Sequence, residues 1–162
     1  MKCEMTPIGT VRGGRTSPTD DDWDSVRSRI ELDGNILDES STAGLNEFSH
    51  VEVIFQFNGV DESQICRSVR HPRGREDWPL VGILAQRAKD RPNRIGTTVC
   101  RLHGTGPLWL EVSGLDAIDG TPVIDIKPFI LGFAPRGEVR EPAWATELME
   151  GYWSVATPDS VL

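Results

Sequence analysis

The sequence predicts a mainly β fold: a small single-domain β-barrel, not of the Rossmann type, with a short helical C-terminal arm. Three observations lead to this prediction. Short apolar runs rich in β-branched and aromatic residues recur along the chain, and Gly or Pro interrupts them at short intervals. These runs do not alternate with long amphipathic helices, as they would in a doubly wound sheet. The sequence also has no G-x-G-x-x-G turn, the fingerprint of dinucleotide-binding sites.

The clearest strand is expected at residues 51–57, where Val-Glu-Val-Ile-Phe-Gln-Phe is short, β-branched and aromatic. The same reasoning predicts further strands, in chain order, at residues 10–12, 28–32, 80–85, 97–102, 108–112 and 122–126. Turn-forming pairs such as Asn58-Gly59 and Asp119-Gly120 separate them. Many short strands joined by tight turns are typical of a closed barrel or a sandwich.

Residues 141–153 predict the helical arm. Pro142 suits the first position of a helix, and Gly151 suits the residue just past its end. Trp144 and Leu148 lie between them at helical spacing, so we expect the arm to pack on the barrel or on a neighbouring subunit. Residues 15–25 place four aspartates around Trp23 and predict an exposed acidic loop that favours solubility.

Length and composition bound the remaining possibilities. The 162 residues fit one domain, 1–162, with a core at about 5–130. No apolar run approaches the roughly 20 residues that span a bilayer, and the N-terminus lacks the apolar core of a signal peptide. The three cysteines are widely spaced, which predicts reduced thiols, neither a disulfide framework nor a metal site, and a cytoplasmic protein.

The charge distribution is uneven along the chain. The net charge is −8, but residues 67–101 contain nine basic and three acidic side chains, so this segment carries +6 and the rest −14. Eight of the nine are arginines, the side chain best suited to bidentate phosphate contact. Two interpretations follow: a surface for an RNA backbone, or a solvated loop whose arginines pair with the protein's own carboxylates. The candidate RNA-binding residues are Arg70, Arg73, Arg75 and Arg94.

Two segments carry most of the polar chemistry: 87–96, Arg-Ala-Lys-Asp-Arg-Pro-Asn-Arg-Ile-Gly, and 119–129, Asp-Gly-Thr-Pro-Val-Ile-Asp-Ile-Lys-Pro-Phe. In a strand, alternate residues share a face, so Asp125 and Lys127 are expected side by side, with Val123 on the same face. A carboxylate beside an ammonium group there forms either a functional site or a structural ion pair.

The two segments resemble signature motifs of the TsaA-like family, whose best-known members are S-adenosylmethionine-dependent tRNA N6-threonylcarbamoyladenosine N6-methyltransferases. Residues 7–11 (Pro-Ile-Gly-Thr-Val), 44–50 (Gly-Leu-Asn-Glu-Phe-Ser-His) and 112–122 resemble the same family, in the same order. The resemblance implies a β-barrel, S-adenosylmethionine as cofactor, tRNA as partner and a homodimer. It does not extend to every position, because Ala88-Lys89-Asp90 stands where the family usually has Ser-Pro-His, and Phe129 where it often has tyrosine.

The cofactor implied by the resemblance carries a sulfonium, an amine, a carboxylate and an adenine, which need acceptors, a cation and an apolar slot. The candidate catalytic residues are Asp125, Lys127 and Asp119, with the identity of any general base left open. The candidate cofactor-binding residues are Gln86, Arg87, Arg91, Pro92, Asn93, Leu115, Asp119, Gly120, Thr121 and Phe129. Two alternatives stay open: a methyltransferase of the same fold acting on a small molecule, and a non-catalytic module that binds S-adenosylmethionine or RNA.

Overall fold

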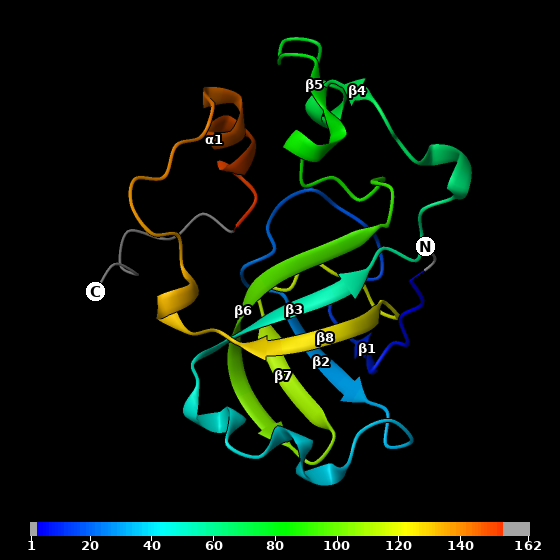
Figure 1. Ribbon diagram of the computed structural model, residues 1–162, viewed down its shortest axis with the longest axis vertical. Helices are drawn as coiled ribbons and strands as arrows, with labels where there is room; N and C mark the ends of the chain where they lie inside the picture. The colour runs from blue at the N-terminus through cyan, green and yellow to red at the C-terminus, as the bar shows by residue number, and fades with distance from the viewer. Residues whose placement is uncertain (1–2, 154–162) are drawn as a thin grey trace.

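The computed structural model describes residues 3–153, and most of the regular structure is β (Figure 1). Six antiparallel strands close a barrel in the order β1-β2-β7-β6-β3-β8, with β8 returning to β1. The strands are β1 (Gly9–Arg12), β2 (Arg27–Leu32), β3 (His50–Gln56), β6 (Ile95–Gly106), β7 (Trp109–Ser113) and β8 (Pro122–Pro128). The predicted mainly β barrel is therefore confirmed.

The remaining elements are short and lie outside the barrel. Strands β4 (Val69–Arg70) and β5 (Val81–Gly82) form a separate two-stranded ladder beside α1 (Ala143–Met149), at one end of the molecule (Figure 1). Trp78 links the two parts, because its indole Nε1 donates to Glu147 Oε2 at 2.8 Å and its ring lies 6.4 Å from that of Trp144. Six 3₁₀ helices complete the described chain: η1 (Glu39–Thr42), η2 (Leu45–Glu47), η3 (Glu62–Gln64), η4 (Pro72–Gly74), η5 (Ile83–Ala85) and η6 (Leu131–Phe133).

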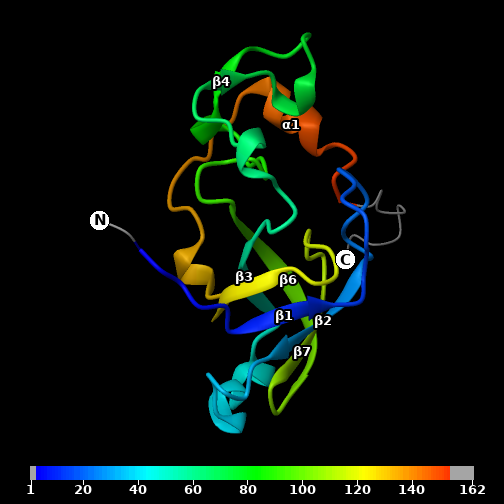
Figure 2. The same cartoon turned by 90° about the vertical axis from the view of Figure 1, so that its right-hand side faces the viewer.

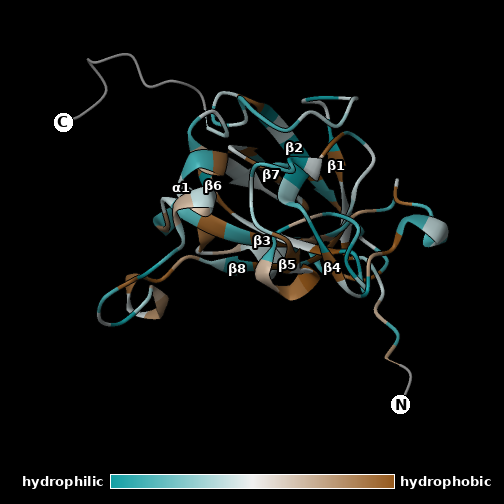
Figure 3. Cartoon of the chain, turned by 90° about the horizontal axis from the view of Figure 1, so that it is seen from above, coloured by the Kyte–Doolittle hydropathy of each residue, from teal (hydrophilic) through white to brown (hydrophobic). Residues whose placement is uncertain are grey.

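Apolar and polar residues alternate along the strands, which Figure 3 colours by hydropathy. The apolar side chains fill the barrel interior. Val51, Val53 and Phe55 of β3 are fully buried and pack with apolar side chains of the other strands. Each such side chain stabilises the fold by roughly 1.5–3 kcal/mol through burial. Gly96 of β6 allows the Phe55 ring to approach closely, since a Cβ there would lie 2.5 Å from ring atoms. β3 is thus fixed between β6 and β8 by its inner face, which leaves its outer face free for other chemistry.

A β-bulge in β8 changes the predicted facing of its side chains. Ile54 pairs with Asp125 but Phe55 pairs with Val123, so Ile124 has no partner and the register shifts by one. Val123 is therefore buried in the core, while Asp125 and Lys127 lie on the outer face. The expectation that Val123 shares a face with the two charged residues is wrong, because strict alternation does not hold across the extra residue.

Two other boundaries differ from the sequence-based expectation. Of the strand predicted at 80–85, only Val81 and Gly82 pair, because their partner β4 is two residues long; the chain then turns into η5. The helix begins at Ala143, with Pro142 as its N-cap and not its first residue, and ends at Met149, so it is one residue shorter at each end than expected. At seven residues, this α-helix of the described chain is too short to cross a membrane.

The acidic loop at 15–25 is anchored rather than free. Asp20, Asp22 and Asp24 are exposed, as expected, but Trp23 is buried and the cation of Arg15 lies 4.5 Å from the centre of its ring. The backbone N–H groups of Asp22 and Trp23 donate to the carbonyls of Gly151 and Tyr152, both at 3.0 Å. The loop therefore ties the C-terminal arm to the barrel.

Candidate active site on the outer face of β6, β3 and β8

The central strand β3 lies between β6, which follows the first polar motif, and β8, which belongs to the second (Figure 1). Glu52 of β3 opposes Lys127 on β8 and Val99 on β6. Ile54, two residues further along, opposes Asp125 and Thr97 in the same way. Side chains that are opposed across antiparallel strands share a face and contact one another. Residues of β3, of β6 and of the second motif therefore form one continuous outer face, which we call the β3 face.

The charged groups of the β3 face contact one another closely. Lys127 Nζ lies 2.6 Å from Asp125 Oδ2, and Asp125 Oδ1 accepts from the backbone N–H of Ile126 at 2.9 Å. Thr97 Oγ1 donates to Glu52 Oε1 at 2.6 Å. The hydrogen bond to Asp125, together with the negative charges of Asp125 and Glu52, raises the pKa of Lys127. Lys127 is therefore a fixed cation at neutral pH, which suits it to hold an anion and not to accept a proton.

These groups are open to a ligand. The side chains of Lys127 and Asp125 are 60% and 45% exposed, so their ion pair contributes little to folding. Val99, which is exposed, and Ile54, which is half-buried, supply apolar surface between the charges. The face thus offers two carboxylates, a fixed cation and an apolar strip within the width of three strands.

Arg87 of the first motif contacts β6 at Thr97, next to the β3 face. Its guanidinium donates to the backbone carbonyl of Thr97, and the side chain is otherwise exposed. Gln86, in contrast, is buried, and its amide donates to the carbonyls of Arg70 and Val81 at 3.1 and 3.0 Å. Arg91 donates to the carbonyl of Gln86 at 3.0 Å. Gln86 and Arg91 therefore brace the loop that carries Arg87.

The turn at 119–121 lies at the rim of the barrel, where β8 begins. Asp119 Oδ1 accepts from the backbone N–H of Gly13 at 2.8 Å, and the carbonyl of Gly120 accepts from the Asn58 amide at 3.4 Å. Asn58 follows β3, and the preceding residue, Phe57, donates its N–H to the carbonyl of Arg94 at 2.8 Å. The turns that precede β6 and β8 thus meet at one rim of the barrel, around the end of β3.

The other predicted cofactor residues occupy different environments. Leu115 is fully buried in the barrel core, so the structure does not bring its side chain to the β3 face. Thr121 is buried as well, whereas Pro92 and Asn93 are exposed in the loop before β6. Phe129 follows β8, where it is half-buried and donates its N–H to the carbonyl of His50 at 3.0 Å.

A cavity of about 430 Å³ lies at the end of the barrel that η1 and η2 cover. It is largely apolar, with Leu32, Leu45 and Leu110 among its lining residues, and it reaches β8 at Asp125 and Ile126. None of residues 86–93 lines this cavity. The second motif therefore borders this cavity, whereas the loop that carries Arg87 does not.

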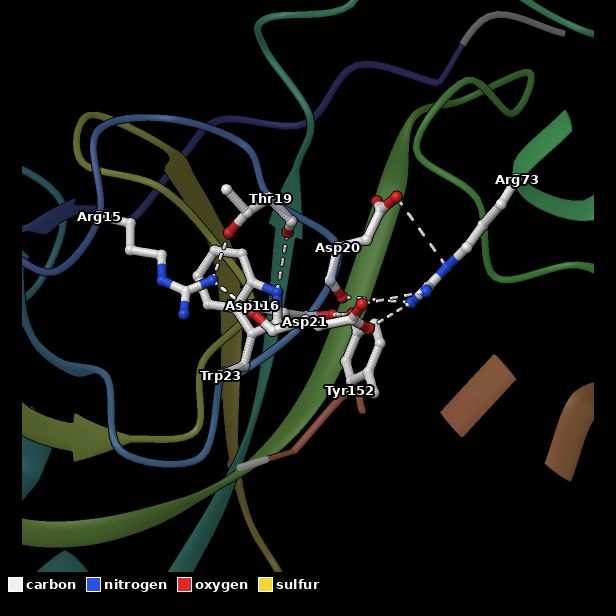
Figure 4. Close-up of polar contacts among 8 residues, drawn as sticks. All are labelled: Arg15, Thr19, Asp20, Asp21, Trp23, Arg73, Asp116 and Tyr152. Carbon is white, nitrogen blue, oxygen red and sulfur yellow. Dashed lines mark hydrogen bonds and ion pairs between the residues drawn. The ribbon is translucent and has the colours of Figure 1, made fainter. Parts of the chain in front are cut away.

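The arginines predicted to bind RNA already have partners within the protein. Arg70 forms a two-point ion pair with Asp90, and Arg73 donates to Asp21 at 2.8 Å (Figure 4). Arg75 pairs with Asp77 and stacks on Trp78, while Arg94 donates to the carbonyl of Val60 at 2.9 Å. This arrangement agrees with the interpretation in which the basic loop pairs with the protein's own acceptors. An RNA contact at these four arginines stays a prediction.

Sequence reasoning missed Glu52 and Thr97 of the β3 face, and a second polar contact at Asp116. Asp116 accepts hydrogen bonds from Thr98 Oγ1 and from Tyr152 Oη, which lies beside Arg73 and Asp21 (Figure 4). Burial and the negative charge of Asp116 raise the pKa of Tyr152 well above its usual range. Alternation along residues 51–57 contained the signal for Glu52 as an outward carboxylate, whereas nothing in the sequence links Asp116 to Tyr152. Among residues 3–153, no cluster of three His, Cys, Asp or Glu side chains is arranged to hold a metal.

Fold and site define a class: small closed antiparallel barrels whose candidate site lies on an outer sheet face, at the point where two polar motifs meet. Residues 15–133 match the family model described as the tRNA-methyltransferase O N-terminal domain. The chain belongs to this family, and the resemblance seen in the sequence motifs is confirmed.

Curated relatives and solved structures agree with this assignment. The chain is 42% identical over 108 residues to a "Putative S-adenosylmethionine-dependent methyltransferase RcsF" of Pseudomonas aeruginosa, covering 65% of this chain and 46% of the relative. It is 36% identical over 110 residues to the "tRNA (adenine(37)-N6)-methyltransferase" of Escherichia coli K12, covering 65% of this chain and 46% of the relative. The chain thus spans about half the length of these two curated relatives.

Another relative matches over nearly its whole length. The "Probable S-adenosyl-L-methionine-binding protein" of Methanothermobacter thermautotrophicus is 35% identical over 133 residues, which cover 80% of this chain and 91% of the relative. Among solved structures, the crystal structure of TrmO from Pseudomonas aeruginosa superposes with a TM-score of 0.71 and 29% identity. That alignment covers 89% of this chain and 62% of the other.

Proposed function

We propose that this protein transfers the methyl group of S-adenosylmethionine to N6 of adenosine 37 in tRNA, in its threonylcarbamoylated form. The observation that carries the proposal is the β3 face, where Asp125 and Lys127 of the second family motif lie on the same outer surface as Glu52, and where Arg87 of the first motif contacts the backbone of Thr97. Relatives named as methyltransferases of this adenine support the choice of reaction.

The groups of the β3 face fit the parts of the cofactor. Lys127, with Arg87 nearby, is a fixed cation for the carboxylate of the amino acid tail. Asp125 and Glu52 are acceptors for its amine and for the positive charge on sulfur. Exposed Val99 and half-buried Phe129 are apolar surface for the adenine. When bound, S-adenosylmethionine supplies an electrophilic methyl group on a sulfonium, so the face needs no metal.

The contribution of the protein is mainly orientation. Alignment of two reactants lowers such barriers by roughly 7–11 kcal/mol in well-ordered systems, and the strands of a barrel hold their side chains rigidly. The acceptor nitrogen loses a proton, which a carboxylate of the site takes up. Asp119 and Asp125 are the candidates for this role, and Asp119 lies exposed at the rim where β8 begins, with one oxygen held by the N–H of Gly13. Asp125 is already paired with Lys127.

The protein acts as a homodimer in this proposal. Leu84, Leu131 and Phe133 are apolar side chains that are 79%, 80% and 86% exposed, which a second copy would cover. We place the active dimer in the cytoplasm, where the three free thiols stay reduced, and treat residues 1–162 as one domain, with a core at about 5–130 and an arm at about 141–153.

One observation favours a second candidate function. The relative that matches over 91% of its own length is named only as a probable S-adenosylmethionine-binding protein. A module that binds the cofactor without transferring its methyl group would use the same β3 face. A methyltransferase acting on a small molecule would also use the β3 face. The identity of the methyl acceptor, or its absence, then distinguishes the tRNA methyltransferase, the small-molecule methyltransferase and the binding module.

The test combines cofactor binding with analysis of the product. Calorimetric titration with S-adenosylmethionine measures whether the cofactor binds. Mass spectrometry of nucleosides from tRNA incubated with protein and cofactor measures whether the adenosine gains a methyl group. We expect binding together with an N6-methylated threonylcarbamoyladenosine. Tight binding with unmodified tRNA would support the binding module or the small-molecule enzyme, and no binding at all would refute all three.

A further inference from the structure

A second group of arginines lies on the outer face of β1, β2, β7 and β6. Figure 2 shows β1, β2 and β7 side by side. Arg12 on β1 opposes Arg29 on β2. Arg27 on β2 opposes Ser113 on β7, and Ser113 in turn opposes Arg101 on β6. We call the surface formed by these four arginines the β2 arginine face. It adjoins the β3 face at β6, because Arg101 and Val99 are alternate residues of that strand and point to the same side.

The positive charge of the β2 arginine face is only partly compensated. Arg12 pairs with Glu31 at 3.3 Å and Arg29 approaches Glu111 at 3.8 Å, in both cases with about half of each side chain exposed. Exposed pairs of this kind are weak and are screened by salt. Arg27 and Arg101 have no ion pair among residues 3–153. Local positive charge therefore remains on a protein whose net charge is −8.

The spacing of the arginines is unfavourable without an anion. Arg12 and Arg29 are directly opposed across β1 and β2, at about 5 Å between Cα atoms, and like charges in this position repel. Arg27 lies two residues from Arg29 on the same strand, about 7 Å away. The Arg29 guanidinium is held 4.3 Å from the centre of the Trp109 ring, which fixes its position. An anion between these groups would relieve the repulsion and find its donors already placed.

A cavity of about 300 Å³ opens between these arginines. Its lining includes Arg12, Arg27, Arg29 and Ser28, and Ser28 is 4% exposed. The hydroxyl of Ser28 is the buried side-chain group of the described residues that has no hydrogen-bond partner. Ser28 alternates with the exposed Arg27 and Arg29 along β2, so its hydroxyl lies on the inner side of the strand and faces away from the arginines. The positive charge of the arginines that line the cavity therefore points to an anionic ligand.

His103 on β6 also lines this cavity. Its Nε2 lies 2.9 Å from Ser113 Oγ. Burial, together with the positive charges of Arg27 and Arg101, lowers the pKa of His103, and the carboxylate of Glu111 opposes this change only in part. Arg27 and Arg101 contribute to this shift, so an anion bound beside them would raise the pKa of His103.

We infer that the β2 arginine face binds phosphate groups of an RNA strand, which under the proposed function is the backbone of the substrate tRNA. The four arginines extend across four adjacent strands, a width of about 14 Å, which exceeds a single phosphate group. A ligand with several phosphates in a row fits this width, and arginine contacts phosphate in a bidentate manner. The inference depends on the proposed function only for the identity of the RNA.

The test removes two arginines that hold no carboxylate. An Arg27→Gln, Arg101→Gln double variant is compared with an Arg136→Gln, Arg140→Gln control, which removes the same charge from the exposed loop before α1. Binding of a fluorescein-labelled RNA hairpin, with the sequence of a tRNA anticodon arm, is followed by anisotropy at 50 to 200 mM KCl. Each lost phosphate contact lowers the salt slope by about 0.7–0.9. In the wild type, RNA affinity falls by some factor between 50 and 200 mM KCl. For two lost contacts, this factor should be about seven- to twelvefold smaller in the double variant, and in the control it should equal the wild-type value.

A second readout does not depend on the substitutions. In the wild-type protein, addition of the hairpin should raise the pKa of His103, followed by its imidazole signals in NMR titrations. If the double variant does not fold, the single Arg27→Gln variant should show half the change in slope. The inference is overturned if the salt slope of the Arg27→Gln, Arg101→Gln variant, or of the single Arg27→Gln variant, equals that of the wild type. It is also overturned if the wild type binds no RNA. A rise in the His103 pKa with inorganic phosphate that RNA does not compete away would assign the cavity to a small anion instead.

The outcome also separates this inference from the proposed function. Cofactor titration of the double variant should give the wild-type affinity, because neither arginine is among the groups of the β3 face assigned to the cofactor. Unmodified tRNA nucleosides together with an arginine-dependent salt slope would refute the proposed reaction and leave the RNA surface standing. Methylated tRNA with an unchanged salt slope would refute the RNA surface alone.

Discussion

Replacing Tyr152 with Phe should loosen the C-terminal arm by a measurable amount. The Tyr152 hydroxyl donates to Asp116, whose other oxygen accepts from Thr98 Oγ1. A hydrogen bond to a charged group contributes about 1.5–3 kcal/mol, and the substitution removes this bond without changing the ring. For a chain of this size, each kcal/mol shifts Tm by about 2–4 °C, so we expect a loss of about 3–12 °C.

The assay is thermal unfolding combined with amide hydrogen exchange. The N–H groups of Asp22 and Trp23 donate to the carbonyls of Gly151 and Tyr152, so both should exchange faster in Tyr152→Phe. The conservative Thr98→Val variant removes the other bond to Asp116, and the double variant should lose less than the sum of the two single ones. Unchanged Tm and unchanged exchange at Trp23 would refute the coupling between the arm and the barrel.

The pH dependence of the same contact has a definite sign. Because burial and Asp116 raise the pKa of Tyr152, the unfolded chain loses the tyrosine proton at lower pH than the folded protein does. The stability that this hydroxyl contributes is therefore fully present below about pH 10 and declines as the pH rises further. Tyr152→Phe should lose this alkaline decline while keeping the rest of the stability curve.

Two further substitutions test the packing and the surface. Gly96→Ala should cost about 1–3 kcal/mol in urea unfolding, because the new Cβ would lie 2.5 Å from the Phe55 ring, whereas Gly82→Ala, which meets open space, should have little effect. Phe133→Ser should shift sedimentation velocity profiles from dimer to monomer, while Ile36→Ser, at a less exposed apolar position, leaves them unchanged. A monomeric wild-type protein would remove the basis for the proposed dimer.

The sequence was sufficient for the barrel because its strands are locally consistent. Residues 51–57 alternate between core and surface, and the structure ends that strand within one residue of the prediction. The strand predicted at 97–102 lies within β6, which continues to Gly106 because β7 supplies partners through a second irregularity near Gly104. The length of a strand depends on how far its neighbouring strand can pair with it, and the local sequence pattern gives no information on this.

The candidate site was predictable only in part, for the same reason. Asp125 and Lys127 were placed together correctly, since two residues of one strand define their own face. Val123 was misplaced because a bulge requires knowledge of the partner strand. Glu52 lies in the site because its strand pairs with β8 in a register that places it opposite Lys127. Arg73 of the basic loop pairs with Asp21, a carboxylate far away in sequence. Long-range pairing of charges leaves no local signal.

The most direct test of the β3 face is the affinity for S-adenosylmethionine of Lys127→Met, measured by calorimetry beside the wild type and Arg140→Gln. Lys127 is exposed and its ion pair contributes little to folding, so the variant should unfold at the wild-type temperature. Loss of a charge-assisted bond to the cofactor carboxylate should weaken binding about tenfold to a hundredfold, with Arg140→Gln unchanged. A folded Lys127→Met protein that binds the cofactor as tightly as the wild type would show that the site lies elsewhere.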